Sequence, residues 1–258
     1  MARVHATAAV EAGAQLAPDV EVGAFVHVGA EVILEAGVVL LPHAVVAGRT
    51  RVGEGTRVHS FAAVGGSPQD RDFEGEPTVL EIGQGNVIRE HVSIHVGSSQ
   101  GPRGTRLGDR NYVLNGAHIG HDCQVGSDCV ISSFAGLAGH VEVGDYAVLG
   151  AYTGVHQFAR IGESVMSAAN SKLSKDAPPF ALVAGDRARL LGLNRVGLLR
   201  RGLDIGVRDA LKRAFHLLFH SKLRMHLALE RVRSEVPGVT EVDRLLEFIE
   251  RSERGFCR

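Results

Sequence analysis

The chain has 258 residues, with 28 lysines and arginines against 29 aspartates and glutamates, and a formal net charge of −1. This balance gives no indication of a nucleic-acid-binding protein. Three cysteines are too few for a disulfide framework, and neither a signal peptide nor an apolar run of the roughly 18 residues that span a membrane is present. We therefore expect a soluble protein of the cytoplasm.

A six-residue repeat of aliphatic side chains begins at Val4 and runs to Val64. It resumes after an interruption, and its last series runs from Leu107 to Leu173, with Ser167 as the one member that is not aliphatic. This period fits neither an α-helix nor a plain alternating strand. It predicts a solenoid of short parallel strands, three per 18-residue coil, in which position i+18 lies directly above position i. Glycine often follows the aliphatic residue, and we expect it to supply turn geometry that other residues resist.

Two segments interrupt the repeat, "GGSPQDRDFEGEPT" (65–78) and "GSSQGPRGTR" (97–106). Both are rich in glycine, serine, proline and charge, which predicts loops that project from the coils. Long loops on a rigid scaffold often carry binding groups, although a solenoid also tolerates insertions without function. We expect the solenoid to stop at the prolines of "DAPPF" (176–180), within a solenoid domain over residues 1–184.

Residues 185–258 change to a helical pattern and form a predicted C-terminal α-helical domain. Apolar residues recur at helical spacing over 208–223 and 240–252, and Thr240 is the expected N-cap of the second helix. This domain holds 16 basic and 10 acidic side chains, whereas the solenoid holds 12 and 19. Solvated helix faces or an acidic docking partner would each account for the basic excess.

The motif "HIGHDC" (118–123) brings two histidines, an aspartate and a cysteine together. A closed metal site needs three or four ligands. Cys123 and Cys129 lie six positions apart and therefore on different faces of the coil, and no further ligand has an obvious place. We expect no metal here.

The 18-residue spacing instead predicts a catalytic arrangement. It places Gly139 above His121 and His140 above Asp122. A histidine can accept a hydroxyl proton near neutral pH, an adjacent carboxylate can orient it, and a glycine leaves space and an amide N–H for an oxyanion. An exposed polar face is the alternative, but histidines 118, 121, 140 and 156 all fall on three successive coils. The pattern favours acyl transfer.

Taken together, several motifs resemble a known family. They are "QD" in the first loop, "AHIGHDC", "LAGH", "VHQF", "DAPPF", "GLNRVGLLRRG" and the ending "RSERGFCR". With the repeat, they are similar from end to end to the acyl-carrier-protein-dependent UDP-N-acetylglucosamine O-acyltransferases, which carry out the first acylation of lipid A synthesis. The resemblance implies a left-handed parallel β-helix with a C-terminal helical domain. It also implies a homotrimer with active sites between neighbouring subunits, and no cofactor.

The same resemblance implies roles for individual residues. His121 corresponds to the general base, Asp122 to its orienting partner and Gly139 to the oxyanion amide. The acyl carrier protein becomes the acidic partner of the basic tail. The residues implied to contact the sugar, the nucleotide or the donor are Gln69, Asp70, His118, His140, His156, Gln157, Asn194, Arg200 and Arg201. Those that correspond to the end of the acyl chain are Met166, Ala169 and Arg187.

Two positions depart from the common family pattern, since Asp72 stands where many members have lysine and Val196 where they have glutamate. These changes alter the charge around the sugar, so a UDP-glucosamine with a 3-amino group is a possible acceptor.

Our leading hypothesis is transfer of a 3-hydroxyacyl chain from acyl carrier protein to the 3-position of UDP-N-acetylglucosamine. The alternatives are the same reaction on the 3-amino sugar, a coenzyme A-dependent hexapeptide acetyltransferase, a metal-dependent hydratase on this scaffold and a non-catalytic solenoid. The basic helical tail disfavours the acetyltransferase, and the histidine constellation disfavours the scaffold.

Overall fold

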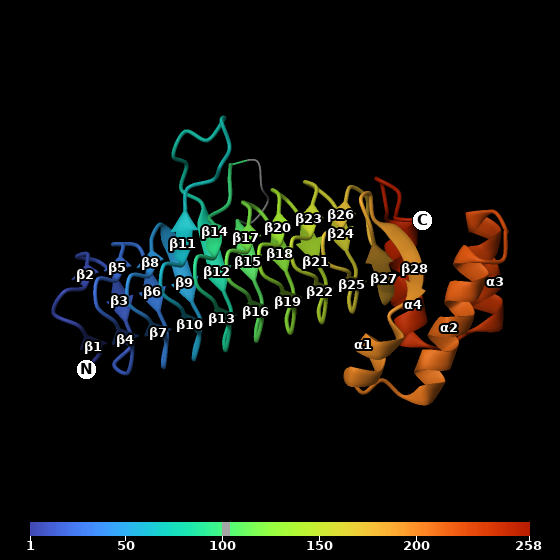
Figure 1. Cartoon of the computed structure of the whole chain (residues 1–258), viewed down its shortest axis with the longest axis horizontal. Coiled ribbons are helices and arrows are strands. Elements are labelled where there is room, and N and C mark those ends of the chain that lie inside the picture. The colour runs from blue at the N-terminus through green and yellow to red at the C-terminus, as the bar shows by residue number, and fades with distance from the viewer. Residues whose placement is uncertain (100–103) are drawn as a thin grey trace.

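The computed structural model describes residues 1–99 and 104–258. Short strands form one long three-sided prism that ends against a helical domain (Figure 1). The first sheet, eleven-stranded in the described chain, contains β1 (Arg3–Val4), β4 (Glu21–Val22), β7 (Val39–Leu40), β10 (Arg57–Val58), β13 (Val87–Ile88), β16 (Tyr112–Val113), β19 (Val130–Ile131), β22 (Val148–Leu149), β25 (Met166–Ser167), β27 (Ala181–Ala184) and β28 (Arg189–Leu193). The second sheet, nine-stranded over the same residues, contains β2 (Ala9–Val10), β5 (His27–Val28), β8 (Val45–Val46), β11 (Ala63–Gly66), β14 (Ser93–His95), β17 (His118–Ile119), β20 (Gly136–Leu137), β23 (Gly154–Val155) and β26 (Lys172–Leu173). The third, eight-stranded within those ranges, contains β3 (Gln15–Leu16), β6 (Ile33–Leu34), β9 (Arg49–Val52), β12 (Val79–Ile82), β15 (Thr105–Leu107), β18 (Gln124–Val125), β21 (Glu142–Val143) and β24 (Arg160–Ile161).

The strand register confirms the predicted 18-residue coil. Val4 pairs with Val22 in the first sheet, and His118 pairs with Gly136 in the second, in parallel. The two interruptions of the repeat fall between consecutive strands, and residues 100–103 of the predicted second loop lie outside the described residues. The first leaves the prism between β11 and β12, and the second separates β14 from β15.

The aliphatic residues of the repeat fill the interior of the prism. Ile119 and Leu137 are completely buried, as is Ser167, whose hydroxyl accepts the Gly150 N–H at 3.1 Å. Two early positions depart from the expected burial, because Val4 is 45% exposed and Val10 37% exposed. These residues belong to the first coil, which has a neighbouring coil on one side only.

Most glycines that follow the aliphatic residues have a different role from the expected one, although Gly65 does have a positive φ of 81°. Gly53 has no positive φ, but a Cβ there would lie 2.5 Å from the carbonyl carbon of Gly83 in the next coil. Such glycines are needed because the stacked backbones approach closely. The left-handed turn positions are instead occupied mostly by larger residues such as Asp122, with a φ of 60°, and His140, with a φ of 61°. Aspartate and histidine tolerate this conformation better than most side chains.

The sheet continues beyond the prolines at which we expected it to stop. β27 pairs in parallel with β25, and β28 then adds in antiparallel direction. Pro178 and Pro179 precede β27, so neither removes an N–H donor from this pairing. The division into residues 1–184 and 185–258 stays a prediction, and the pairing of β27 with β28 crosses it.

The C-terminal region contains four helices in the described chain, which are α1 (Arg195–Arg200), α2 (Ile205–Phe219), α3 (Met225–Glu235) and α4 (Thr240–Glu250). The sequence predicted helices over the regions of α2 and α4 and missed α1 and α3. Thr240 is the first helical residue and not the N-cap, which is Val239. Among the described helices, none has both the length and the apolar character to cross a membrane.

Specific polar contacts fix the helical domain to the end of the prism. Glu163, in a turn of the solenoid, forms ion pairs with Arg201 at 2.7 Å and with Arg244. The buried Asp176 holds the C-terminal segment, because its carboxylate accepts the Ser252 hydroxyl at 2.7 Å and its carbonyl accepts the Cys257 N–H at 2.8 Å. The end of the chain therefore lies against the last coils.

Candidate active site

The turns that connect the second sheet to the third carry the histidine motif. They comprise residues 120–123, 138–141 and 156–159, which stack along one edge of the prism. We call this edge the histidine edge. Its backbone is held by the coil-to-coil ladder, in which the His140 N–H donates to the His121 carbonyl at 2.9 Å. Side chains on this edge are therefore fixed relative to one another.

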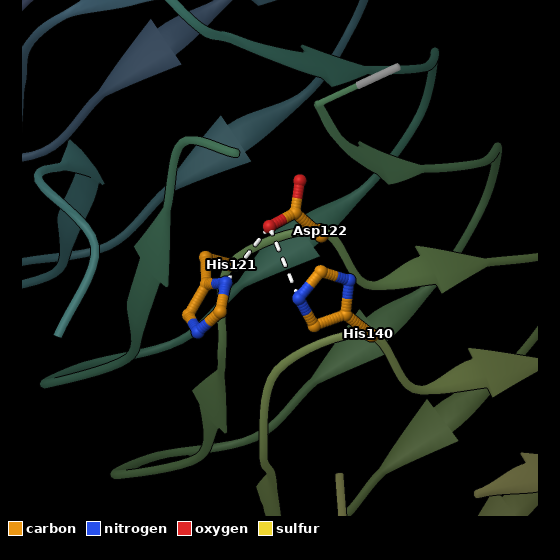
Figure 2. A group of neighbouring side chains, drawn as sticks. All are labelled: His121, Asp122 and His140. Atoms are coloured by element: carbon orange, nitrogen blue, oxygen red, sulfur yellow. Dashed lines mark hydrogen bonds and ion pairs between the residues drawn. The ribbon is translucent and has the colours of Figure 1, made fainter. Parts of the chain in front are cut away.

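His121 and Asp122 form a closely coupled pair (Figure 2). The His121 Nδ1 lies 2.8 Å from the Asp122 Oδ2, and the aspartate side chain is completely buried. His140 approaches the same oxygen through its Nε2, but at 3.7 Å. Because its Nδ1 is bound to the carboxylate, His121 offers its Nε2 to a substrate.

Gly139 lies against the free nitrogen of His121. A Cβ at this position would be 2.5 Å from the His121 Nε2, which is closer than non-bonded atoms approach. The spacing of 18 residues thus brings together the two groups that the sequence predicted. The Gly139 N–H donates no hydrogen bond to any group in the described part of the chain.

Ser98, which follows β14, and Thr105, the first residue of β15, hold Asp122 in place, and the sequence prediction missed both. Ser98 donates its hydroxyl to the Asp122 Oδ2 at 2.7 Å and its backbone N–H to the same oxygen at 3.0 Å. The Asp122 N–H in turn donates to the Thr105 hydroxyl at 2.8 Å. The 18-residue spacing gives no position for Ser98, because this residue lies outside the repeat.

A groove of about 1100 Å³ runs beside the histidine edge over the outer face of the second sheet. Its floor includes Gly136 and Gly154, and a Cβ at either glycine would meet no atom within 4 Å. The side chains that line it also include His118, His156, Lys172, Lys175, Asp186, Arg187 and Arg254. The floor of the groove therefore has no side chain at these two glycines, and its rim is mainly cationic.

Two further histidines lie close together beside the pair. His118 is hydrogen-bonded through its Nδ1 to the Ser93 hydroxyl at 2.8 Å, and its ring meets that of His95 edge to face, with 4.9 Å between the centroids. Burial lowers the pKa of His95 to about 4, with smaller effects from the charges of His118 and His121. Burial also lowers the pKa of His118. The sequence prediction missed His95.

The remaining predicted residues do not meet His121 within one chain. Gln69 and Asp70 lie in the loop that projects from the prism after β11 (Figure 1). Asn194 caps α1 by accepting the Gly197 N–H at 3.0 Å, and Arg201 packs over the Tyr146 ring at 4.1 Å. Arg200 lies in α1, Met166 in β25, and Ala169 shortly after β25. By contrast, Gln157 follows His156 on the histidine edge, and Arg187 lines the groove.

The geometry of the site bears on two other chemistries, a cysteine nucleophile and a bound metal ion. Burial raises the pKa of Cys123 to about 12, which disfavours a thiolate nucleophile. Ligand atoms of His121, Asp122 and His140 lie within 4.8 Å of one another, a spacing that a metal ion could use. The hydrogen bonds from Ser98 and the His121 ring already account for the Asp122 Oδ2. The expectation of no metal stays a prediction.

Comparison with known proteins agrees with this geometry. The family model described as "Bacterial transferase hexapeptide (six repeats)" matches residues 104–139, and that described as "Udp N-acetylglucosamine O-acyltransferase; Domain 2" matches residues 176–257. The chain thus belongs to the transferases built from hexapeptide repeats.

Full-length relatives define the family within that class. The acyl-[acyl-carrier-protein]–UDP-N-acetylglucosamine O-acyltransferases of Thiobacillus denitrificans and Burkholderia orbicola are 43% and 45% identical to this chain, and the alignments cover all of both chains. The UDP-N-acetylglucosamine O-acyltransferase structure from Moraxella catarrhalis superimposes with a TM-score of 0.96 at 35% identity, over 99% of each chain. This chain belongs to the family of acyl-[acyl-carrier-protein]–UDP-N-acetylglucosamine O-acyltransferases, and its solenoid is a left-handed parallel β-helix.

Proposed function

We propose that this chain transfers a 3-hydroxyacyl group from the thioester of acyl carrier protein to the 3-hydroxyl of UDP-N-acetylglucosamine, the first step of lipid A synthesis. Its full-length relatives carry this donor and acceptor in their names. The observation that carries the proposal is the position of the His121 Nε2 against Gly139, with the Nδ1 bound to a buried carboxylate.

In the proposed mechanism His121 acts as general base through its Nε2. It takes the proton of the acceptor hydroxyl as that oxygen attacks the thioester carbonyl carbon. The Gly139 N–H stabilises the oxyanion of the tetrahedral intermediate, and Asp122 stabilises the imidazolium. Collapse of the intermediate breaks the carbon–sulfur bond, and the His121 imidazolium returns its proton to the leaving thiolate. The products are the sugar ester and the free carrier thiol.

The groove is the proposed binding site of the acyl chain and the donor. Gly136 and Gly154 leave space along the sheet, whereas Lys172 occupies the next position of the same ladder and forms an ion pair with Asp186 at 2.6 Å. The cationic rim suits a phosphate-bearing donor. Three residues that the sequence predicted for the site also line this groove, namely His118, His156 and Arg187.

The predicted residues on other faces are part of the same proposal. We infer that a neighbouring subunit of a homotrimer supplies the residues that one chain keeps away from His121. These are Gln69, Asp70, Met166, Ala169, Asn194, Arg200 and Arg201. The cytoplasmic location rests on the same family membership.

The 3-amino sugar is a second candidate acceptor, favoured by the charge of the first loop. Asp70, Asp72, Glu74 and Glu76 all lie in this loop, and Arg71 is its one basic residue. Such a loop would favour an acceptor that can carry a positive charge.

Competition between the two UDP-sugars, with a defined carrier thioester and mass spectrometry of the products, tests both acceptors. Formation of an acylated sugar nucleotide by the wild type but not by His121→Ala supports the proposed reaction. A preference of tenfold or more for the hydroxyl sugar, about 1.4 kcal/mol, excludes the amino sugar as the main acceptor. Equal rates with the coenzyme A thioester would favour the acetyltransferase alternative. Activity that depends on an added metal would favour the hydratase.

A further inference from the structure

Asp122 is the most enclosed charged group of the histidine edge, and two imidazoles compete for it. Its side chain is fully buried, with the His121 Nδ1 at 2.8 Å from one carboxylate oxygen and the His140 Nε2 at 3.7 Å from the same oxygen. An aspartate that turned toward His140 would leave His121 without its orienting partner. Another contact must therefore fix the direction of the carboxylate.

We propose that Ser98 is a positioning residue that holds Asp122, and through it His121, in the orientation required for acyl transfer. This inference rests on the proposed function. Ser98 is buried, with 4% of its surface exposed, and its hydroxyl donates to the Asp122 Oδ2 at 2.7 Å. Its backbone N–H lies 3.1 Å from the Oδ1 and 3.0 Å from the Oδ2, so it donates to both oxygens.

These contacts serve two physical purposes. A buried carboxylate is costly unless hydrogen-bond donors satisfy it. The hydroxyl also acts on the oxygen that His121 shares, so the Ser98 Oγ and the His121 Nδ1 together define the rotation of the Asp122 side chain. His140 alone, at 3.7 Å, lies beyond the distance of a good hydrogen bond.

The local backbone is shaped for this approach. A Cβ at Gly97 would lie 2.4 Å from the Cα of Gly104 and 2.8 Å from the Asp122 Oδ1, so only a glycine permits the two ends of the loop to come this close. Thr105, at the other end, accepts the Asp122 N–H at 2.8 Å. The described ends of the second loop therefore clamp the aspartate from both its backbone and its side chain.

Three substitutions of Ser98 separate the hydroxyl from the shape of the side chain, and a fourth variant serves as a control. Ser98→Ala removes the hydroxyl and keeps the N–H, whereas Ser98→Thr and Ser98→Val have similar shapes and differ in the hydroxyl. We expect Ser98→Ala and Ser98→Val to lower kcat by about 10- to 100-fold, the range for a lost hydrogen bond to a charged group, with KM within about threefold of wild type. Ser98→Thr should recover most of the Ser98→Val loss. The control Ser99→Ala alters the exposed neighbouring serine and should leave kcat unchanged.

A double-mutant cycle with Asp122→Asn distinguishes positioning from a general effect on the loop. If Ser98 acts through Asp122, Ser98→Ala should lower kcat by less than about threefold in the Asp122→Asn background, measured under single-turnover conditions with excess enzyme. The same 10- to 100-fold loss in both backgrounds would overturn the proposal, as would a Ser98→Ala variant within twofold of wild type. Acyl transfer by the wild type and its loss in His121→Ala report on the proposed function separately.

Discussion

Two edges of the prism have the same backbone geometry and different chemistry. At the turns between the first and second sheets, Phe25, His43, Phe61 and His91 occupy left-handed positions on successive coils, and their rings stack at centroid distances of 5.1, 5.0 and 5.2 Å. We call this the aromatic edge. At the histidine edge, His140 stacks on Phe158 at 4.6 Å. There the stack stops, because Asp122 occupies the position one coil before His140.

The repeat stacks like side chains along an edge, whereas the site requires an interruption of that stacking. The coil places side chains of equivalent positions about one strand spacing apart, and like rings then stack along an edge. At the histidine edge this stacking is interrupted twice. Asp122 places a carboxylate where the stack would have a ring, and Gly139 places no side chain next to His121. Changes at the histidine edge should therefore affect catalysis, whereas changes at the aromatic edge should affect stability.

The largest expected effect is that of His121→Ala. Loss of a positioned general base should lower kcat by on the order of 10²–10⁴-fold. The melting temperature should change little, because His121 lies outside the aliphatic interior. Steady-state rates and thermal unfolding measure the two quantities, and a rate within a few-fold of wild type would remove His121 from the mechanism.

Gly139→Ala fills the space beside His121 that the missing side chain of Gly139 leaves open. The added methyl would lie 2.5 Å from the His121 Nε2, so the imidazole must move. A displacement of about 1 Å at a reacting group can lower the rate by about 100-fold, and we expect a loss of this order in kcat. Gly206→Ala, in α2, where an added Cβ meets no atom within 4 Å, is the matched control. Equal activity of Gly139→Ala and the wild type would contradict the proposed geometry.

The buried histidines beside the histidine edge should make stability depend on pH. The folded pKa of His95, about 4, lies below the usual value of 6.5, so the unfolded chain binds the additional proton between these values. Stability should therefore fall as the pH is lowered through this window, by on the order of 2 kcal/mol from His95. Denaturant unfolding from pH 7 to pH 4.5 measures this slope, and His95→Gln should flatten it. An unchanged slope in His95→Gln would assign the dependence to other groups.

The smallest effect is expected at the aromatic edge. Phe61→Ala removes the stacking with both His43 and His91, but the ring is 53% exposed. Aromatic pairs contribute about 0.5–1.5 kcal/mol each, and this exposure favours the lower part of that range. We expect a modest decrease in melting temperature and wild-type kcat for the purified variant. A large loss of activity would show that the two edges are not functionally distinct.

Residues within the repeat could be placed from the sequence, because a fixed period relates sequence distance to position in space. His121 and Gly139 were aligned in this way. Ser98 lies in an interruption of the repeat, where the period gives no position. Thr105 is the first residue of β15, but the period alone does not show that its hydroxyl accepts the Asp122 N–H. Asp122 was predicted as the partner of His121, but the groups that hold it were not.

The helical region was harder to predict for a different reason. Its elements depend on tertiary contacts that have no local sequence signal, such as those of α1 with the solenoid and of α3 with α2. The α1 helix is six residues long, and its cap Asn194 also donates to the Ser164 carbonyl at 2.9 Å in the solenoid. The α3 helix begins after Arg224 with no side-chain cap. The α1 helix therefore lacks the length, and the α3 helix lacks the cap, that pattern analysis needs.

The fixed register between coils has a consequence for how genes of this type can change in length. Insertion of one residue within a coil would turn every later aliphatic side chain of that coil out of the interior. Duplication or deletion of a whole 18-residue coil before β14 would keep the alignment of His121 with Gly139, since each strand pairs only with its neighbours. The loop between β11 and β12 can absorb other lengths, because it returns the chain to the same ladder. Inherited length differences should therefore occur as whole coils within the prism and in any size within this loop.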